Sequence, residues 1–246
     1  ERIAGIEVPD RAKYLRTITL ELCRLSSWLM GMGGLAGALG HYSVMYLMML
    51  DRDYILDLFE WITGTRIYHI YNIPGGVRRD TPDGWIEKLN ETIDYLEGRL
   101  IEYDNLLFEN PVIHDRLTGI GKITQEDAIK FGIVGPWLRS TGVAQDLRID
   151  QPYAAYGELD VPMITQEKSD ALARAVQVRL EYEATFKLIR QAVKQLPKGD
   201  FKTEIGNPLH FKVPKGSAYA KVESSKGEFG YYVVSDGGDK PERIAV

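Results

Sequence analysis

From Leu25 to Leu50 the chain carries no Asp, Glu, Lys or Arg. This uncharged stretch is longer than the roughly 18 apolar residues that would suggest a helix crossing a membrane. Glycines interrupt it at five positions, and serine and histidine side chains add polarity, whereas a simple span is more uniformly Leu, Ile and Val. The stretch therefore predicts two helices joined by a turn and buried inside a larger soluble assembly.

Helical periodicity extends on both sides of the uncharged stretch. Apolar residues three and four apart predict a first helix over residues 10–30, with Asp10 as its N-cap. The second helix is expected over about residues 43–63, with Gly64 ending it. Further helices are expected over residues 83–108, 124–132 and 166–196. The last is expected to be the longest, and Pro197 to end it.

The remaining segments predict loops and a small β element. Residues 66–82 are expected to form a loop, and residues 133–165, rich in Gly, Pro and Tyr, an ordered but irregular segment. Residues 218–222 and 228–234 have the pattern of two strands of an antiparallel hairpin, and residues 244–246 resemble the start of another strand.

The expected fold class is therefore mainly α, with a small antiparallel β-hairpin near the C-terminus. Residues 1–196 would form the helical core, as a fragment of a larger subunit. Residues 197–246 would form a linker and the small β element.

Composition argues against several classes of function. The single cysteine, Cys23, excludes a disulfide framework and a four-cysteine metal site within the chain, and its place in an apolar helix predicts a core residue. The net charge is −5 and Arg78-Arg79 is the one notable basic pair, so nothing favours nucleic acid as a partner. The histidines, at positions 41, 69, 114 and 210, are too scattered for a local metal motif.

Two patterns resemble binding motifs. Residues 31–36 follow the dinucleotide pattern G-x-G-x-x-A, but a helical segment precedes them where that motif needs a strand, so close helix contact is favoured. The second helix also carries an acidic cluster made of Asp51, Asp53, Asp57 and Glu60. A metal or proton site is compatible with this spacing, but a face paired with Arg52 and Arg66 is favoured.

Five segments, in the same order along the chain, resemble the large subunit of respiratory complex I, known as the 49 kDa subunit. They are E-L-C-R-L at 21–25, D-L-F-E with T-G-T-R at 57–66, G-G-V at 75–77, L-R-S-T-G-V with D-L-R and P-Y at 138–153, and E-S-S-K-G-E-F-G-Y-Y-V-V-S-D-G at 223–237. The last is the most specific. The family is related to the large subunit of nickel-iron hydrogenases, whose C-x-x-C pairs would lie outside this chain.

The resemblance implies a hydrogenase-large-subunit-like helical bundle in the peripheral arm, on the cytoplasmic face of the membrane and not itself transmembrane. The bundle would pack on a small iron–sulfur subunit that carries the terminal [4Fe-4S] cluster, among other peripheral-arm and membrane-arm subunits. Quinone would be reduced between the two subunits, coupled to ion pumping, in an NADH-, ferredoxin- or deazaflavin-dependent oxidoreductase. The chain would bind no metal or cofactor of its own and would be inactive alone.

Three residues depart from the family pattern. Ala38 stands where an Asp is usual that relays protonation at the quinone head, Tyr68 where a His is usual beside the cluster, and Trp28 replaces a common helix His. Because a histidine titrates near neutral pH and a tyrosine does not, a variant electron acceptor or proton coupling is one interpretation. The other is that His69, which follows Tyr68, or another neighbour has taken over and the chemistry is unchanged.

Tyr68 and His69 are the predicted catalytic residues. The other residues that the resemblance places near substrate or cluster are Arg24, Ala38, Gly75, Gly76, Val77, Arg78, Arg139 and Asp146. A buried arginine needs a partner, so for Arg24 an ion pair with Glu21 or Asp57 is favoured over a substrate contact. The two glycines are expected to meet a backbone requirement.

Arg139 and Asp146 are expected to hold the irregular segment together. Two alternative functions remain open at this point. One is the large subunit of a membrane-bound hydrogenase or sulfur reductase; the G-V-R-R-D sequence at 76–80 resembles the membrane-bound hydrogenases. The other is a non-catalytic scaffold subunit, which Ala38 and Tyr68 would suit.

Overall fold

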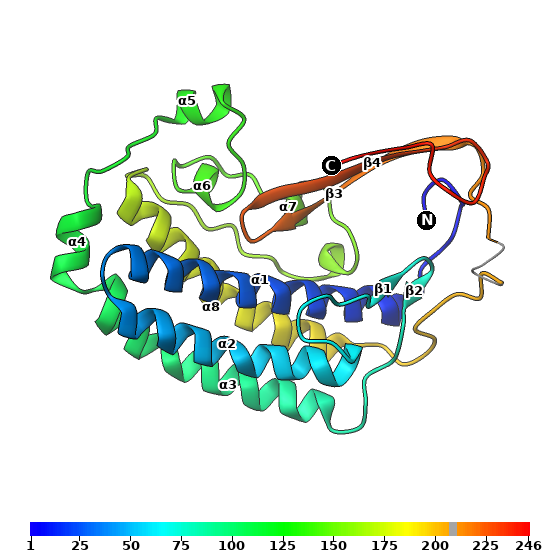
Figure 1. Cartoon of the computed structure of the whole chain (residues 1–246), viewed down its shortest axis with the longest axis horizontal. Helices are drawn as coiled ribbons and strands as arrows, with labels where there is room; N and C mark the ends of the chain where they lie inside the picture. Colours follow the sequence, from blue (N-terminus) through cyan, green and yellow to red (C-terminus); the bar gives the residue numbers. More distant parts are fainter. Residues whose placement is uncertain (207–210) are drawn as a thin grey trace.

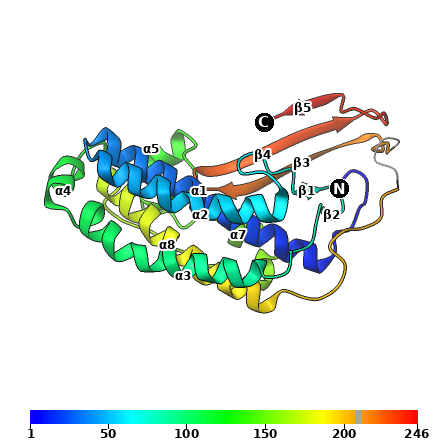
Figure 2. The same ribbon diagram turned by 60° about the horizontal axis from the view of Figure 1, so that its bottom comes forward.

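A bundle of four long helices with a sheet laid across it makes up the chain, in a computed structural model that describes residues 1–206 and 211–246 (Figures 1 and 2). The long helices are α1 (Asp10–Ala38), α2 (Tyr42–Thr63), α3 (Trp85–Tyr103) and α8 (Ala171–Gln195). Their buried apolar faces form one core. The expected mainly α fold class is confirmed. His210 and part of the predicted linker lie outside the described residues.

Helix α1 does not end before the glycine run, as the periodicity suggests, but continues through it to Ala38. The reason is close contact with α2: a Cβ on Gly37 would lie 2.9 Å from the sulfur of Met45, and one on Gly33 3.2 Å from Cε of Met49. Packing at this distance offsets the cost of glycine inside a helix, which is about 1 kcal/mol per residue. The glycines thus serve helix contact, and no described helix is long and apolar enough to cross a membrane.

Some helix ends lie where the sequence predicts them, and others differ. Gly64 ends α2 in the left-handed conformation, as predicted. Asp10 is the first residue of α1 and does not cap it. The N-cap of α8 is Asp170, whose carboxylate accepts from the Ala173 amide at 2.8 Å, so this helix begins later than predicted and is shorter than α1. A π-helical turn, Asp104–Phe108, extends α3.

Short elements fill the segments between the long helices. The irregular segment is ordered, as predicted, but contains two helices and a 3₁₀ turn. The short elements are β1 (Asn72–Ile73), β2 (Gly76–Val77), α4 (Pro111–Leu117), α5 (Gln125–Lys130), α6 (Pro136–Arg139), α7 (Leu147–Asp150) and the 3₁₀ turn (Tyr156–Glu158). Cys23, predicted to lie in the core, is exposed instead, because it sits on the outer side of α1.

The predicted hairpin is present, and a third strand extends it into a sheet of order β3-β4-β5. The strands are β3 (Gly216–Ser224), β4 (Gly227–Ser235) and β5 (Arg243–Ala245), all antiparallel. The tip between β3 and β4 rests on α1 and α6. Trp28 donates to the Ser225 carbonyl at 3.1 Å, and the backbones of Gly135 and Gly227 are so close that a Cβ on Gly135 would lie 2.3 Å from Cα of Gly227.

Candidate functional site

The loop that follows α2 is fixed by one arginine. Arg66 binds the acidic face of α2, with Asp57 at 2.5 Å, Glu60 at 2.7 Å and Asp53 also in contact. The ion-paired interpretation of this acidic face is therefore correct for Arg66. Arg52 does not take part, because its Nε donates to the hydroxyl of Ser26 at 3.0 Å.

The two predicted catalytic residues point in different directions from this loop. His69 stacks on Phe59 with ring centroids 3.9 Å apart, and its Nδ1 lies 3.2 Å from the Thr65 carbonyl. Partial burial lowers the pKa of His69 below its ordinary value. Tyr68 is 85% exposed. A fixed loop thus presents Tyr68 to the surroundings and keeps His69 against the helix.

Exposed apolar side chains flank Tyr68 on the same loop. Ile67 and Ile70 are each about two thirds exposed, and Trp61 near the end of α2 is 47% exposed. Large apolar side chains gathered at one surface mark contact sites in soluble proteins. We name the surface of this loop, made of Ile67, Tyr68 and Ile70, the loop face.

The β1–β2 hairpin lies next in sequence, and backbone geometry explains its glycines. Gly75 donates its amide to Oε1 of Glu1 at 2.8 Å, and Arg16 donates to the Gly76 carbonyl at 2.8 Å. At Gly76 φ is +156°, and a Cβ there would lie 2.3 Å from the Phe201 carbonyl oxygen. The preference for a backbone requirement over a ligand role is thus supported. The neighbouring residues differ: Val77 is buried and Arg78 is exposed.

A second group of predicted site residues lies inside the protein. Three arginines and four carboxylates, none more than 5% exposed, form what we name the buried ion cluster. Its members are Glu21, Arg24, Arg139, Asp146, Arg148, Glu181 and Glu223. They come from α1, α6, α7 with its N-cap, α8 and the end of β3, so the cluster joins the sheet to the helices.

Arg139 is at the centre of this cluster. Its guanidinium donates to both oxygens of Glu181, at 2.7 and 3.1 Å, to Glu223 at 2.9 Å and to the Gln145 carbonyl at 2.8 Å. Arg148 donates from Nη2 and Nε to the two carboxylate oxygens of Asp146, at 2.7 and 3.0 Å. The expectation that Arg139 and Asp146 hold the irregular segment together is confirmed.

Arg24 shows what sequence reasoning found and what it missed. Its Nε lies 3.3 Å from Glu21, as predicted, but its second carboxylate partner is Glu181 and not Asp57. Arg24 also donates to the Ser224 carbonyl at 2.9 Å. Glu181 carried no local signal, because it is one charge among several on an amphipathic helix and its partners are far away in sequence.

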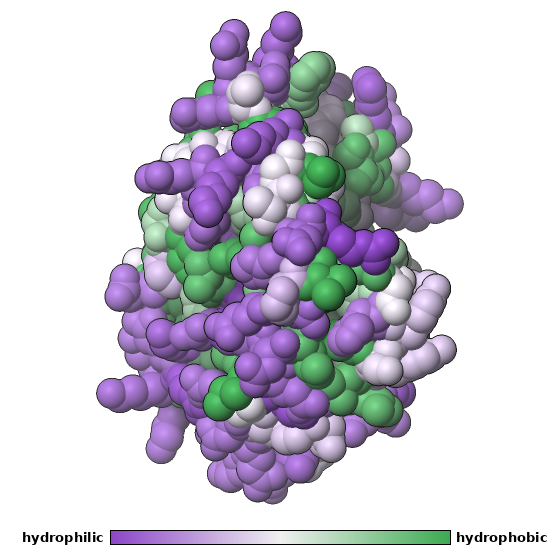
Figure 3. All heavy atoms as spheres, turned by 90° about the vertical axis from the view of Figure 1, so that its left-hand side faces the viewer, coloured by the Kyte–Doolittle hydropathy of each residue, from purple (hydrophilic) through white to green (hydrophobic). Residues whose placement is uncertain are grey.

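Ala38 lies apart from both groups. It is exposed at the end of α1, beside the α1–α2 turn, whereas Tyr68 follows the opposite end of α2. Because α2 has 22 residues, these two ends are about 33 Å apart. Seen from the end that carries the turn, the surface alternates between apolar and hydrophilic areas (Figure 3). The two departures from the family pattern are thus not brought together.

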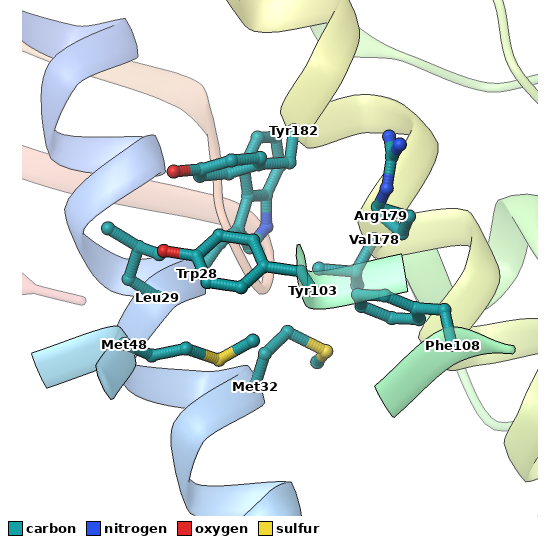
Figure 4. A pocket seen from close by; sticks show the side chains of 9 residues that line it. All are labelled: Trp28, Leu29, Met32, Met48, Tyr103, Phe108, Val178, Arg179 and Tyr182. Atoms are coloured by element: carbon teal, nitrogen blue, oxygen red, sulfur yellow. The ribbon is translucent and has the colours of Figure 1, made fainter. Parts of the chain in front are cut away.

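A small pocket lies near the π-helical turn (Figure 4). Its volume is about 20 Å³, and its lining is mainly apolar and aromatic, with Trp28, Met32 and Phe108 among the residues around it. Among the described residues, no group of three or more His, Cys, Asp or Glu side chains is placed to bind a metal.

Comparisons with known proteins agree with this architecture. Residues 38–210 and 207–246 match the family model of the respiratory-chain NADH dehydrogenase 49 kDa subunit. A subunit of the NADH-quinone oxidoreductase of Thermosipho melanesiensis is 43% identical over 248 residues, which cover 100% of this chain and 68% of the relative. A subunit of the same enzyme from Rhizobium etli is 38% identical over 270 residues, with 100% and 67% covered.

One solved structure is similarly close. A chain of the membrane-bound sulfane sulfur reductase, an archaeal respiratory membrane complex, matches with a TM-score of 0.95 and 44% identity. The match covers 99% of this chain and 66% of that one. The chain described here therefore spans about two thirds of the length of these relatives.

Proposed function

Because the chain belongs to the family of the respiratory-chain NADH dehydrogenase 49 kDa subunit, we propose that its loop face forms one side of the site where a complex I-like oxidoreductase delivers electrons to an acceptor. Its relatives are subunits of NADH-quinone oxidoreductase and of a related respiratory membrane complex, which are oxidoreductase assemblies. In the proposal, a neighbouring iron–sulfur subunit carries the cluster, and quinone is the acceptor.

The observation that carries the proposal is the contrast between the loop's fixed base and its exposed tip. Three ion pairs from Arg66 and the stacking of His69 on Phe59 order the loop. Ordering apolar side chains at a surface without covering them costs free energy, which a contacting subunit would recover. The loop face therefore suits a site completed by a second chain, on the peripheral, cytoplasmic side of a membrane assembly.

The contribution of this chain to the chemistry would be positioning and control of protons. Tyr68 has a hydroxyl that can donate one hydrogen bond to a sulfur or oxygen atom at the boundary. His69, with its lowered pKa, stays neutral at neutral pH, and it would accept a proton once the negative charge added to a reduced neighbouring centre raises that pKa. The redox chemistry itself belongs to the partner's cluster and to the acceptor.

A second candidate function is reduction of a sulfur compound by the same assembly. The observation in its favour is that the chain is as similar to the sulfane sulfur reductase, at 44%, as to a relative from NADH-quinone oxidoreductase, at 43%. Ala38 and Tyr68, which stand where the family pattern has an Asp at the quinone head and a His beside the cluster, point the same way. Acceptor assays with a short-chain quinone and with a polysulfide, on one preparation of the assembled complex, distinguish the two.

The role of the loop face is tested by Tyr68→His in the assembled complex. A titratable imidazole at this exposed position would stabilise the reduced cluster more at low pH, so the cluster's midpoint potential should gain a pH dependence between about pH 6 and 8. Redox titration followed by electron paramagnetic resonance measures this potential.

Two controls accompany this test. Tyr68→Phe should leave the pH dependence as it is, and so should Tyr54→His, which places an imidazole on the exposed side of α2 away from the loop face. A potential that responds equally to the histidine at both positions, or to neither, would argue against the loop face as the cluster-facing surface.

A further inference from the structure

The buried ion cluster is not balanced in charge. Among the described residues it contains three guanidinium groups and four carboxyl groups, so full ionisation leaves one net negative charge in a site closed to water. A buried charge that lacks compensation costs several kcal/mol, and a carboxyl group in that position takes up a proton instead.

The four carboxyl groups differ in the number of guanidinium groups that contact them. Each of Glu21, Asp146 and Glu181 contacts two guanidinium groups within 3.6 Å. Glu21 also accepts from the Tyr156 hydroxyl at 2.6 Å. Glu223 lies against a single guanidinium among the described residues, and its other oxygen has only a long contact of 3.5 Å to the Leu147 amide.

We propose that the buried ion cluster binds one proton from solvent, held by the carboxyl group of Glu223, and that this proton keeps the tip of the β3–β4 hairpin docked on α1. The proton makes the cluster neutral, with three guanidinium ions matched to three carboxylates. The second oxygen of Glu223 then needs no cation.

The position of Glu223 connects this proton to the hairpin tip. It pairs across the hairpin with Glu228, and the residues that follow it are held by α1. Arg24 donates to the Ser224 carbonyl at 2.9 Å, and the Ser225 and Ser27 hydroxyls are 2.7 Å apart. Loss of the proton would add a negative charge 2.9 Å from Arg139 and close to Arg24, whose Nη1 also lies 3.4 Å from the Glu223 carbonyl. The added charge would attract Arg24 and compete with its bond to Ser224.

Charged groups from every packed element surround the site. They are Glu21 and Arg24 from α1, Arg139 from α6, Asp146 and Arg148 at α7, Glu181 from α8, and the pair of Lys221 and Glu228 within the sheet. Two titratable hydroxyls of the irregular segment also face the site: Tyr153 accepts from the Glu223 amide at 2.9 Å, and Tyr156 donates to Glu21. Burial raises the pKa of Glu223; Arg139 and Arg24 oppose this shift and Asp146 adds to it, and the net direction is upward. Burial opposes ionisation of Glu21 as well, but Arg148 and Arg24 outweigh it and lower its pKa. The proton therefore belongs on Glu223 and not on Glu21.

Hydrogen–deuterium exchange of the amides at 224–227, followed against pH in the assembled complex, tests the proposal. The folded-state pKa of Glu223 is raised, so the stabilisation is present at low pH and is lost as pH rises through that value. Corrected for the intrinsic rate, opening of the tip should increase by up to about tenfold per pH unit between the ordinary pKa of a glutamate carboxyl group and the raised pKa of Glu223, and should level off above the raised value. Glu223→Gln, which mimics the protonated form, should keep exchange slow at all pH values.

Glu228→Gln, the same change on the same hairpin but outside the cluster, should retain the wild-type pH dependence. A wild-type tip whose corrected exchange is independent of pH would overturn the proposal, and this result needs no variant to fold. So would a Glu223→Gln protein that opens faster than wild type at low pH, because the amide would then have removed a needed negative charge.

Discussion

Arg139 keeps its charge at 1% exposure because acceptors surround its guanidinium on three sides. Two of them, Glu181 and Glu223, are themselves buried, and each has Arg139 as its nearest guanidinium partner. At this scale a single residue holds three segments of the chain together: the irregular segment, α8 and the end of β3.

Removal of this side chain should be severe. Arg139→Ala leaves Glu181 and Glu223 without their main partner, and we expect it to lower the free energy of unfolding by about 3–5 kcal/mol. Chemical denaturation followed by circular dichroism measures the loss. The matched control is Arg190→Ala, a partly exposed arginine that pairs with Asp94 and Glu97, for which the loss should be below about 1 kcal/mol. Similar losses in both variants would contradict the structural role assigned to the cluster.

Several members of the buried ion cluster were predicted from the sequence, but most of the contacts between them were not. Arg24 and Glu21 are three residues apart on one helix, so their contact follows from helix geometry. Glu181 and Glu223 approach Arg139 across separations of 42 and 84 residues, which no local pattern reports. The functional roles of Tyr68 and His69 remain predictions, because both depend on what contacts the loop face.

The ends of helices were predicted correctly where the conformation or side chain of one residue determines them. Gly64 ends α2 and Thr124 caps α5 because each has the conformation or side chain that its position needs. The expected end of α1 was wrong, because glycine's weak helix propensity was overridden by packing against α2. The third strand was indicated by only three residues, whose partners on β4 fix them.

The β1–β2 hairpin provides a prediction at the scale of one element. Gly76→Ala would place a methyl group against the backbone of Phe201 and Lys202, and we expect a loss of more than about 1 kcal/mol. Gly98→Ala, at an open position on α3, should instead stabilise the protein by about 0.5–1 kcal/mol. Thermal unfolding of the two variants compares them directly, and a loss at both positions would show that backbone contact is not the cause.

The whole molecule has two layers that meet at the buried ion cluster. Helices α1 and α8 carry its charges on one side, and the sheet and the irregular segment carry them on the other (Figure 2). The division into a helical core at 1–196 and a β element at 197–246 remains a prediction. The buried contacts between the two parts favour unfolding as one unit, since neither part satisfies its charges alone.

The separation of Ala38 from Tyr68 by the length of α2 has a consequence for how the two changes combine. Sites this far apart, with no shared partner, are expected to show a coupling free energy below about 0.5 kcal/mol. In the assembled complex, Ala38→Asp and Tyr68→His should therefore change the logarithm of the turnover rate by amounts that simply add in the double variant. A double-mutant cycle measures this, with His69→Gln and Phe59→Leu as a stacked pair expected to deviate from additivity.

Additivity would mean that the two departures are separate adjustments, each free to arise or revert on its own. A change of electron acceptor would then not require both the alanine at position 38 and the tyrosine at position 68. A strong coupling would instead imply that a partner or the acceptor spans the full length of the helix pair and senses both ends at once.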